Sequence, residues 1–535
     1  MAPRVVTADA VAGLVRGGDT IMIGGSGNGH AVPDSLIAAV GARFRATGAP
    51  AALTTVHPVG LGDRSSRGID HLAEPGCLKR VVCGTLVDSA RVEKLAADNR
   101  IEAYTIPQGA LSQLTREMAA GRPGLVTHVG LKTHIDPRLG GGKQSTLCSE
   151  ELVEVVELGG REWLFYKPFR VDICFLRGTT ADEDGNVTME HEAIFGEMIS
   201  MAQATRRAGG IVAVEVKRLA NRGTLPPKQV KIPGMLVDLV VVEPAQTQTF
   251  VTGYSPSYAG ELKVPMSQIA PLPFSPRKVI ARRAALELFP GAICNLGSGI
   301  STGIATIAAE EGVLNTVTLT NEQGLIGGAP ATGNEAGASR NFQAMIDQPY
   351  QFDFYDGGGL DLAFLSFAEV DAACNVNVSR FGDRIIGVGG FVNISQNAKK
   401  IMFSGTFTSG GLDLAWEGGR MTVRSEGRER KFVKGVQQLS YSGAYAAERG
   451  QAALYITERA VFRRDARGRL ELIEIGPGVE LERDVLAHMD FAPEVAPDLR
   501  VMDERLFDPA PMGLAGDLSR AGPAVRSPRL AELPA

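Results

Sequence analysis

Residues 171–188 read VDICFLRGTTADEDGNVT, and residues 360–377 read LDLAFLSFAEVDAACNVN. The two stretches align without a gap. Their identical positions are Asp172/Asp361, Phe175/Phe364, Leu176/Leu365, Asp182/Asp371, Asn186/Asn375 and Val187/Val376. Each stretch starts as an apolar strand, continues through a polar loop and ends in an Asn-containing turn. The repeat predicts that the chain is built from two related halves.

The beginning of the first half shows a strand, a glycine turn and a helix in succession. Thr7 is placed to cap a short helix that ends at Gly17-Gly18. A strand over 20–23, the turn Gly24-Gly25-Ser26-Gly27 and a helix over about 34–47 then follow. This order is typical of βαβ units in an open parallel sheet.

The second half begins in the same way. Ser275 caps a predicted helix, and Pro276 occupies the first helical position, where its missing N–H costs nothing. A strand over 292–296, the turn Gly297-Ser298-Gly299 and a helix over about 302–312 follow. The sequence therefore predicts an α/β protein with two related open α/β domains and a cleft between them.

The spacing of these matches predicts the domain organisation. Because the two matches have different offsets, the first half (1–265) is expected to carry an insertion in about 60–150. A Pro-rich linker is expected over 266–278, and the second half over 279–508. Residues 509–535 are rich in Pro, Ala and Gly, and we expect a flexible tail there.

Composition narrows the possible functions. The chain has 535 residues, of which 44% are hydrophobic and 21% charged, as in ordinary globular proteins. A net charge of -5 gives no basic surface for nucleic acid. We expect no signal peptide and no membrane span, hence a cytoplasmic protein. The six cysteines and seven histidines form no metal-ligand motif, so no metal site is expected.

The glycine turns do not match a nucleotide fingerprint. GxGxxG fails at Gly25-Ser26-Gly27, at Gly297-Ser298-Gly299 and at a third turn, Gly387-Val388-Gly389, because the third glycine position holds His30, Thr302 and Val392. The glycines either shape strand-to-helix turns or bring backbone amides to ligand phosphates. Under the second interpretation, six residues would contact phosphate or substrate: Gly25, Gly27, Gly297, Gly299, Gly142 and Lys143. Lys143 is equally consistent with a solvated loop lysine.

One acidic residue stands where such sheets bind ligands. Glu322, in TNEQGLIGG (320–328), follows a predicted strand over 316–320. Ligands of open α/β sheets bind beyond the carboxyl ends of the strands. The comparable segment of the first half, TTVHPVG (54–60), has no carboxylate. Glu322 is therefore a candidate site residue, the alternative being a plain turn carboxylate.

Several motifs together resemble family I coenzyme A transferases of the single-chain acetate/propionate type, from about residue 5 to 508. The resemblance is carried by HPVGLGDRSSRGIDHLAEPGCLKRVVCGT (57–85), IEAYTIPQGALSQL (101–114), THVGLKTHIDPRLGGGK (127–143), RGTTADEDGNVTMEHEA (177–193), KQVKIPGMLVD (228–238), TNEQGLIGG, CNVNVSRFGDRIIGVGG (374–390) and EIGPGVELERDVLAHMDFAP (474–493). It implies a CoA-transferase/NagB-like fold in which alpha- and beta-type halves are fused.

The resemblance also implies a mechanism. Glu322, in the Glu-x-Gly motif, would be the nucleophile that carries CoA as a thioester in ping-pong catalysis. Asn377, Gly387, Gly389 and Gly390 would form the oxyanion and CoA-contacting groups. CoA would be substrate and covalent intermediate, with no tightly bound cofactor, no metal and no ATP. The partners would be an acyl-CoA and a carboxylic acid, in a homodimer or homotetramer.

Four positions depart from what the resemblance leads us to expect: Asn321, Gln323, Lys132 and Ser26. If they face the acyl group, a polar, larger or dicarboxylic acid becomes a candidate substrate, with Lys132 as its carboxylate partner. Two alternatives stay open, an acyl-CoA hydrolase on the same fold and a non-catalytic ligand-sensing protein. A nicotinamide dehydrogenase is disfavoured by the failed fingerprints.

Overall fold

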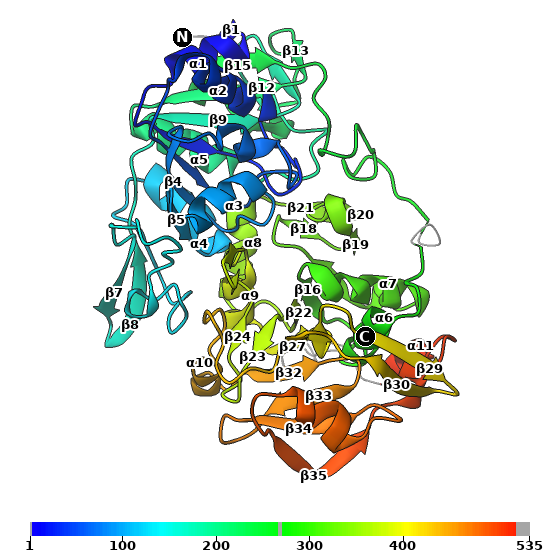
Figure 1. Cartoon of the computed structure of the whole chain (residues 1–535). Helices are drawn as coiled ribbons and strands as arrows, with labels where there is room; N and C mark the ends of the chain where they lie inside the picture. The colour runs from blue at the N-terminus through cyan, green and yellow to red at the C-terminus, as the bar shows by residue number, and fades with distance from the viewer. Residues whose placement is uncertain (1–2, 266–269, 521–535) are drawn as a thin grey trace.

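The computed structural model describes residues 3–265 and 270–520. Two large sheets, one in each half, form the frame of the molecule, and helices α8 and α9 lie between them (Figure 1). One hydrophobic cluster continues across the halves, since Tyr104 and Leu114 belong to it together with Phe352 and Ile394. Helix α4 of the first half packs on α8 and α9 of the second. The halves are thus joined by a shared core.

The first sheet has eight strands, and every neighbouring pair is parallel. In sheet order the strands are β1 (Arg4–Val6), β15 (Leu239–Val242), β12 (Ile211–Val216), β9 (Ile173–Arg177), β2 (Thr20–Ile23), β3 (Leu53–His57), β4 (Leu78–Cys83) and β5 (Glu102–Thr105). The helices of this half are α1 (Ala8–Leu14), α2 (Asp34–Thr47), α3 (Ala90–Ala97), α4 (Gln108–Ala119) and α5 (Met198–Arg207).

The second sheet has ten strands with a parallel centre and antiparallel pairs on both sides. In sheet order they are β21 (Ala344–Met345), β18 (Leu325–Ile326), β17 (Thr318–Thr320), β16 (Ile293–Leu296), β22 (Leu362–Ser366), β27 (Lys400–Ser404), β32 (Ala452–Ile456), β33 (Ala460–Arg464), β34 (Leu470–Ile475) and β35 (Glu494–Val501). The helices here are α6 (Pro276–Ala285), α7 (Gly303–Glu310), α8 (Gln348–Asp356), α9 (Phe391–Asn397), α10 (Gly443–Glu448) and α11 (Leu514–Arg520).

Smaller sheets of two to four strands accompany these two sheets. Strands β7 (Val153–Leu158) and β8 (Arg161–Tyr166) form a hairpin that projects from the first half (Figure 1). The others are β6 (Leu125–Thr127), β10 (Thr180–Asp182), β11 (Val187–Thr188), β13 (Arg218–Ala220), β14 (Val230–Ile232), β19 (Ala329–Pro330), β20 (Ser339–Arg340), β23 (Glu369–Val370), β24 (Val376–Asn377), β25 (Arg380–Phe381), β26 (Arg384–Ile385), β28 (Thr408–Ser409), β29 (Asp413–Glu417), β30 (Arg420–Ser425) and β31 (Glu429–Arg430).

The two copies of the sequence repeat begin with strands that have equivalent positions in the two sheets. Strands β9 and β22 occupy equivalent places, each between two parallel neighbours. Asp172, before β9, accepts a hydrogen bond from the Thr20 N–H at 2.9 Å, and Asp361, before β22, accepts one from the Ile293 N–H at 3.0 Å. Each aspartate thus fixes the start of the neighbouring strand.

The loops that follow these strands are also built alike. Asp182 accepts hydrogen bonds from the backbone and side-chain N–H groups of Asn186, at 2.9 and 3.0 Å. Asp371 accepts the same two bonds from Asn375, both at 3.0 Å. Two of the identical positions in the repeats therefore form equivalent Asp–Asn turns. The prediction of two related α/β domains is confirmed.

Several predicted elements agree with the structure. Thr7 and Ser275 cap α1 and α6. Each hydroxyl oxygen accepts a hydrogen bond from a backbone N–H of its helix, with nitrogen–oxygen distances of 3.2 and 3.4 Å. Strand 20–23 and helix 34–47 have the predicted bounds. The segment over 60–150 contains β4, β5, α3 and α4, and its being an insertion stays a prediction. The domain boundaries at 265 and 279 stay predictions.

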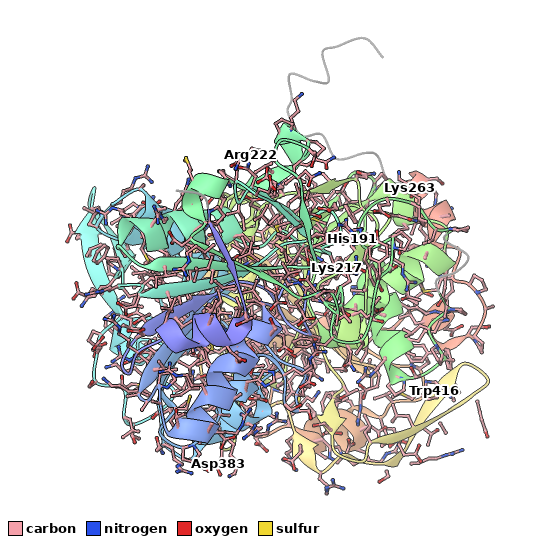
Figure 2. The ribbon with its side chains drawn as sticks, turned by 90° about the horizontal axis from the view of Figure 1, so that it is seen from above. His191, Lys217, Arg222, Lys263, Asp383 and Trp416 are labelled. Atoms are coloured by element: carbon pink, nitrogen blue, oxygen red, sulfur yellow. The ribbon has the colours of Figure 1, made fainter. Side chains whose placement is uncertain are left out.

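The expected linker and tail are only partly loops. Residues 276–278 of the linker belong to α6, and 266–269 lie outside the described residues. Phe274 packs edge-on against Trp416 of β29, with ring centroids 5.4 Å apart; Figure 2 labels this tryptophan. The expectation of a flexible tail is wrong for its first part, because Leu514 and Leu518 of α11 are buried in the core. Residues 521–535 lie outside the described residues.

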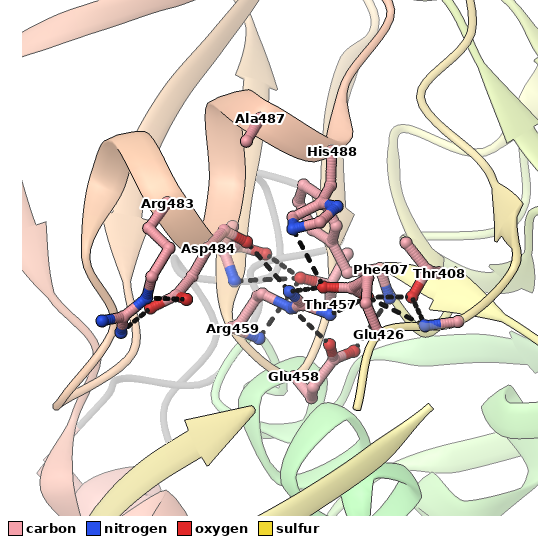
Figure 3. Close-up of polar contacts among 12 residues, drawn as sticks. Phe407, Thr408, Glu426, Thr457, Glu458, Arg459, Arg483, Asp484, Ala487 and His488 are labelled. Carbon is pink, nitrogen blue, oxygen red and sulfur yellow. Dashed lines mark hydrogen bonds and ion pairs between the residues drawn. The ribbon is translucent and has the colours of Figure 1, made fainter. Parts of the chain in front are cut away.

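An ion cluster holds together the second half beyond its central strands (Figure 3). The Arg459 side chain is fully buried and donates hydrogen bonds to both carboxylate oxygens of Glu426 at 2.8 Å. It also donates to Glu458 at 2.9 Å and to the Asp484 carbonyl at 2.9 Å. Every part of the guanidinium thus has an acceptor, as a buried charge requires.

Within the described part of the chain, no helix is both long enough and apolar enough to span a membrane.

Candidate active site

Glu322 stands at the tip of a tight turn directly after β17. Asn321 closes this turn, because its Oδ1 accepts from the Leu325 N–H at 3.2 Å and its Nδ2 donates to the Gly337 carbonyl at 2.9 Å. Gly324 has φ +98°, and a Cβ there would lie 2.0 Å from the Ile346 carbonyl oxygen. The turn therefore requires glycine two residues after the carboxylate. Asn321 has a turn-closing function, which accounts for its polar side chain.

The two oxygens of the Glu322 carboxylate have different neighbours. A Cβ placed on Gly390 would lie only 2.3 Å from Oε2, so this glycine leaves the space in which Oε2 sits. Oε1 lies 3.5 Å from the amide nitrogen of Gln323, which is also 3.4 Å from the Ser26 hydroxyl of the first half. The carboxylate therefore lies where both halves meet.

Burial makes Glu322 a stronger base than an ordinary glutamate. The residue is half-buried, and desolvation raises the pKa of its carboxyl group to about 7, against a smaller lowering by the Gln323 amide. Among the described residues it has no cationic partner. A carboxylate that is desolvated and unpaired is typical of a reactive group.

The first half contributes the turn after β2 to this site. Ser26 and His30 pair as a short bridge, with the Ser26 N–H donating to the His30 carbonyl at 2.9 Å. His30 Nε2 lies 3.0 Å from the Ala336 carbonyl oxygen of the second half. Burial lowers the pKa of His30 to about 4, so the ring is neutral and donates this bond. The predicted contact residues Gly25 and Gly27 belong to this turn, with φ +110° and +48°.

The segment Gly387–Gly390 docks on the carboxyl ends of β4 and β5. The Val388 and Gly389 N–H groups donate to the Gly84 carbonyl at 3.0 and 2.8 Å, and the Gln108 N–H donates to the Gly389 carbonyl at 2.9 Å. A Cβ on Gly387 would lie 2.7 Å from the Gly84 carbonyl oxygen. Gly387 thus permits close approach between the halves, whereas Gly390 faces the carboxylate.

The groups predicted to stabilise the oxyanion differ in whether their N–H donors are already hydrogen-bonded within the protein. The Gly389 N–H is already bonded to Gly84, while the Gly390 N–H has no acceptor among the described residues. Asn377 is fully buried, and its Nδ2 donates to Glu369 and to the Arg380 carbonyl, both at 2.7 Å. Both amide hydrogens of Asn377 are thus occupied in a local turn. A role for Asn377 in the reaction stays a prediction.

The two lysines proposed as ligand contacts have protein partners. Lys132 pairs with Glu448, and Lys143 with Glu151. No contact in the described chain joins either lysine to the Glu322 turn. Lys132 has φ +59°, a backbone conformation that favours glycine, which explains the expectation of glycine at this position. Their roles in ligand binding stay predictions.

The remaining glycine candidates have backbone explanations. A Cβ on Gly142 would lie 2.8 Å from the Thr105 carbonyl oxygen. The Gly297 N–H donates to Phe364 at 2.8 Å, as the Gly24 N–H of the first half donates to Phe175 at 2.9 Å. Gly299 is exposed beside Ser366. Gly297 and Gly299 follow β16, the neighbour of β17, but contact Glu322 nowhere in the described residues.

Sequence reasoning missed the support beneath the carboxylate. The Tyr355 hydroxyl donates to Thr320 at 2.8 Å and accepts from Asn295 at 3.2 Å, below the Glu322 turn. Burial, opposed by these hydrogen bonds, raises the pKa of Tyr355, and the charge of Glu322 adds to that rise. No local motif marks Tyr355, because α8 reaches this place only through the tertiary fold.

Two cavities of about 480 and 700 Å³ lie away from Glu322. The first is lined by charged residues that include Arg283 and Glu474, and the second lies beside α4 and α8. Neither is lined by the Glu322 turn, so we do not assign the reaction to them. Within residues 3–265 and 270–520 no group of His, Cys, Asp or Glu side chains could hold a metal ion.

The two-domain fold and the carboxylate at its junction can now be compared with known proteins. A coenzyme A transferase family model matches residues 5–243. The chain belongs to the coenzyme A transferase family and is a CoA-transferase.

Its relatives include single-chain enzymes of the same length. The acetate CoA-transferase YdiF of Escherichia coli (strain K12) is 43% identical over 512 residues, covering 95% of this chain and 96% of the relative. The caffeate CoA-transferase of Acetobacterium woodii is also 43% identical over 512 residues, covering 94% and 97%. The mouse mitochondrial succinyl-CoA:3-ketoacid coenzyme A transferase 2B is 27% identical, covering 92% and 90%.

Solved structures agree with the fold. The apoenzyme of acyl-CoA transferase YdiF from E. coli O157:H7 superposes with a TM-score of 0.91 at 42% identity, covering 96% of this chain and 97% of the other. The same enzyme has been solved as a thioester complex with CoA, with the same TM-score, 0.91, and coverage.

Proposed function

We propose that this protein transfers coenzyme A from an acyl-CoA to a free carboxylic acid, with Glu322 as the residue that carries CoA. The observation that carries this proposal is a desolvated, unpaired carboxylate at the end of β17, with one oxygen against Gly390 and the other facing Gln323. The family and the thioester complex of the YdiF relative support the same chemistry.

The reaction exchanges bonds of equal type. Ionised Glu322 attacks the acyl-CoA carbonyl, the C–S bond breaks, and a mixed anhydride and CoA thiolate form. The thiolate then attacks Cδ of Glu322, the bond between Cδ and the bridging anhydride oxygen breaks, and the first acid leaves with that oxygen. A second carboxylate reverses these steps. No proton is transferred, which agrees with the absence, among the described residues, of a histidine or lysine that interacts with Glu322.

The environment of Glu322 suits this role. Desolvation makes the carboxylate more basic than a solvated one, and the pKa of about 7 leaves it partly ionised near neutral pH. A cation beside it would stabilise the ground-state carboxylate and weaken its attack. The site thus combines a desolvated carboxylate with the absence, among the described residues, of a competing ion pair.

The proposal also concerns the class of carboxylic acid that accepts CoA. Relatives at equal identity are named for acetate and for caffeate, two acids of very different size. We infer a monocarboxylic acid, because Lys132, our candidate partner for a second carboxylate, is already paired with Glu448. A homodimer or homotetramer and a cytoplasmic location stay predictions.

Incubation with an acyl-CoA alone tests the proposal. Mass spectrometry of the digested protein should find a CoA adduct on the peptide that contains Glu322, and the Glu322→Gln protein should form none. A panel of acids from acetate to cinnamate-type acids then defines the acceptor. Steady release of CoA without an acceptor acid would instead support the hydrolase alternative. A folded wild-type protein that forms no adduct and transfers no CoA would contradict the proposal.

A further inference from the structure

The Gln323 side chain lies between the nucleophile and the first half. It is 7% exposed, and its Nε2 lies 3.5 Å from Glu322 Oε1 and 3.4 Å from Ser26 Oγ. A carboxylate oxygen only accepts hydrogen bonds, so the nitrogen of the amide, and not its oxygen, faces Glu322. The amide carries two hydrogens, one for each of these neighbours.

This placement makes the two oxygens of Glu322 chemically distinct. Oε2 lies against Gly390 and Oε1 faces the Gln323 amide. When CoA thiolate attacks Cδ of the mixed anhydride, the C–S bond forms and the carbonyl electron pair moves to the oxygen that is not bonded to the acyl group. That pair returns as the bond between Cδ and the bridging oxygen breaks, and the acid leaves as a carboxylate with that oxygen and the bonding electrons.

From this geometry we propose that Gln323 donates a hydrogen bond to the oxyanion that forms on Oε1, and that Ser26 of the first half orients the Gln323 amide. The inference rests on the proposed function and assigns Oε2 as the attacking oxygen. Gln323 is a catalytic residue in this scheme because its N–H contacts the reacting carbonyl. Ser26 is a positioning residue.

The long distances are consistent with this role. Hydrogen bonds in active sites are often long before the substrate binds and shorten in the reacting complex. Ser26 is itself fixed, since its backbone N–H donates to the His30 carbonyl at 2.9 Å and His30 Nε2 lies 3.0 Å from the Ala336 carbonyl oxygen. The donor is therefore complete only when the two halves are docked.

Rapid-quench formation of the CoA adduct on Glu322 tests the inference. Gln323→Met keeps the length of the side chain and removes the donor, so adduct formation should slow by about 10²-fold, the effect of one oxyanion donor. KM for the acyl-CoA should change little. The apparent pKa of the step should rise, because the amide also stabilises the ionised carboxylate. Ser26→Ala should slow the step less, by about 10-fold.

Two further variants complete the test. Gln343→Met is the matched control, because Gln343 is exposed on the neighbouring strand connection, and it should react at the wild-type rate. Gln323→Asn keeps an amide on a shorter side chain and should react at an intermediate rate. If Gln323→Met does not fold, Gln323→Asn and Ser26→Ala carry the test.

The outcomes separate this inference from the function on which it rests. A wild-type protein without an adduct would overturn the proposed function itself. An adduct that forms equally fast in the wild-type and the folded Gln323 variants would overturn only the role of Gln323. A slow Gln323→Met with a wild-type rate in Ser26→Ala would remove Ser26 from the scheme.

Discussion

Two glutamates of the second half, Glu322 and Glu426, show how differently the fold treats the same carboxyl group. Both are partly shielded from water. Desolvation alone would raise the pKa of Glu426, but hydrogen bonds from Arg459 and Thr408 outweigh it and lower that pKa to about 2 (Figure 3). Glu322 has no cationic partner in the described part of the chain, and its pKa rises to about 7. Pairing with a cation at Glu426, and stronger desolvation without such a pair at Glu322, separate the structural carboxylate from the reactive one.

The two groups also act in opposite directions on stability. A carboxylate with a lowered pKa stabilises the fold above its unfolded pKa, and this contribution is lost as the pH falls toward the folded value. A carboxylate with a raised pKa costs stability once the unfolded chain is ionised and the folded group is not. The protein thus keeps a destabilising carboxyl group at Glu322 and a stabilising one at Glu426.

The largest effect should come from removing the nucleophile. Glu322→Gln is close in shape to the native residue but cannot form an anhydride, so CoA transfer should fall by about 10⁴-fold or more. Exchange of CoA between two acids, followed by chromatography, measures this. Arg459→Met, once folded, should keep the wild-type rate per folded molecule. A Glu322→Gln protein with wild-type transfer would remove Glu322 from the reaction.

The next effect belongs to the paired site. Arg459→Met leaves the buried Glu458 and Glu426 without their cation and should lower the free energy of unfolding by about 3–5 kcal/mol. Chemical denaturation followed by circular dichroism measures the change. Arg463→Met removes a partly exposed pair with Glu471 and should cost less than about 1 kcal/mol. Equal losses in the two variants would show that the Arg459 cluster is not a special site.

A third prediction concerns the space beside the carboxylate. Gly390→Ala would place a Cβ 2.3 Å from Glu322 Oε2, so the carboxylate must move and transfer should fall by about 10²-fold. Gly435→Ala is the control, because its Cβ would have no neighbour within 4 Å. Thermal unfolding should show both variants folded. Undiminished transfer by Gly390→Ala would mean that the attacking oxygen lies elsewhere.

The smallest expected effect is the stability cost of the nucleophile. At pH 8 an unfolded glutamate is ionised, and the folded Glu322, with its pKa raised to about 7, opposes that charge. Glu322→Gln should therefore stabilise the protein by about 2–3 kcal/mol at pH 8, and the gain should disappear below about pH 4.5. Denaturation at both pH values measures this. A gain that is independent of pH would have another cause.

The sequence predicted well what depends on nearby residues. The capping hydroxyls, strand 20–23, helix 34–47 and the position of Glu322 after a strand follow from short-range patterns. The repeated Asp–Asn turns explain why the internal match was visible at all.

What the sequence did not predict depends on contacts between distant segments. The GVGG glycines looked equivalent, yet Gly387 and Gly389 dock on Gly84 and only Gly390 faces Glu322. Lys132 and Lys143 looked free until tertiary structure supplied Glu448 and Glu151. The expected tail contains the buried helix α11. The Glu311 carboxylate, from a distant segment, accepts hydrogen bonds from the backbone N–H groups at the start of this helix and so fixes its position.

The most direct test follows a heavy oxygen isotope from the acceptor acid into the protein. If Glu322 attacks and is regenerated through an anhydride, one carboxylate oxygen of the labelled acid must be left on Glu322 after a full turnover. Mass spectrometry of the peptide containing Glu322 should then show a mass increase equal to one labelled oxygen, and no other peptide should gain it. Transfer of CoA without label in that peptide would contradict the account.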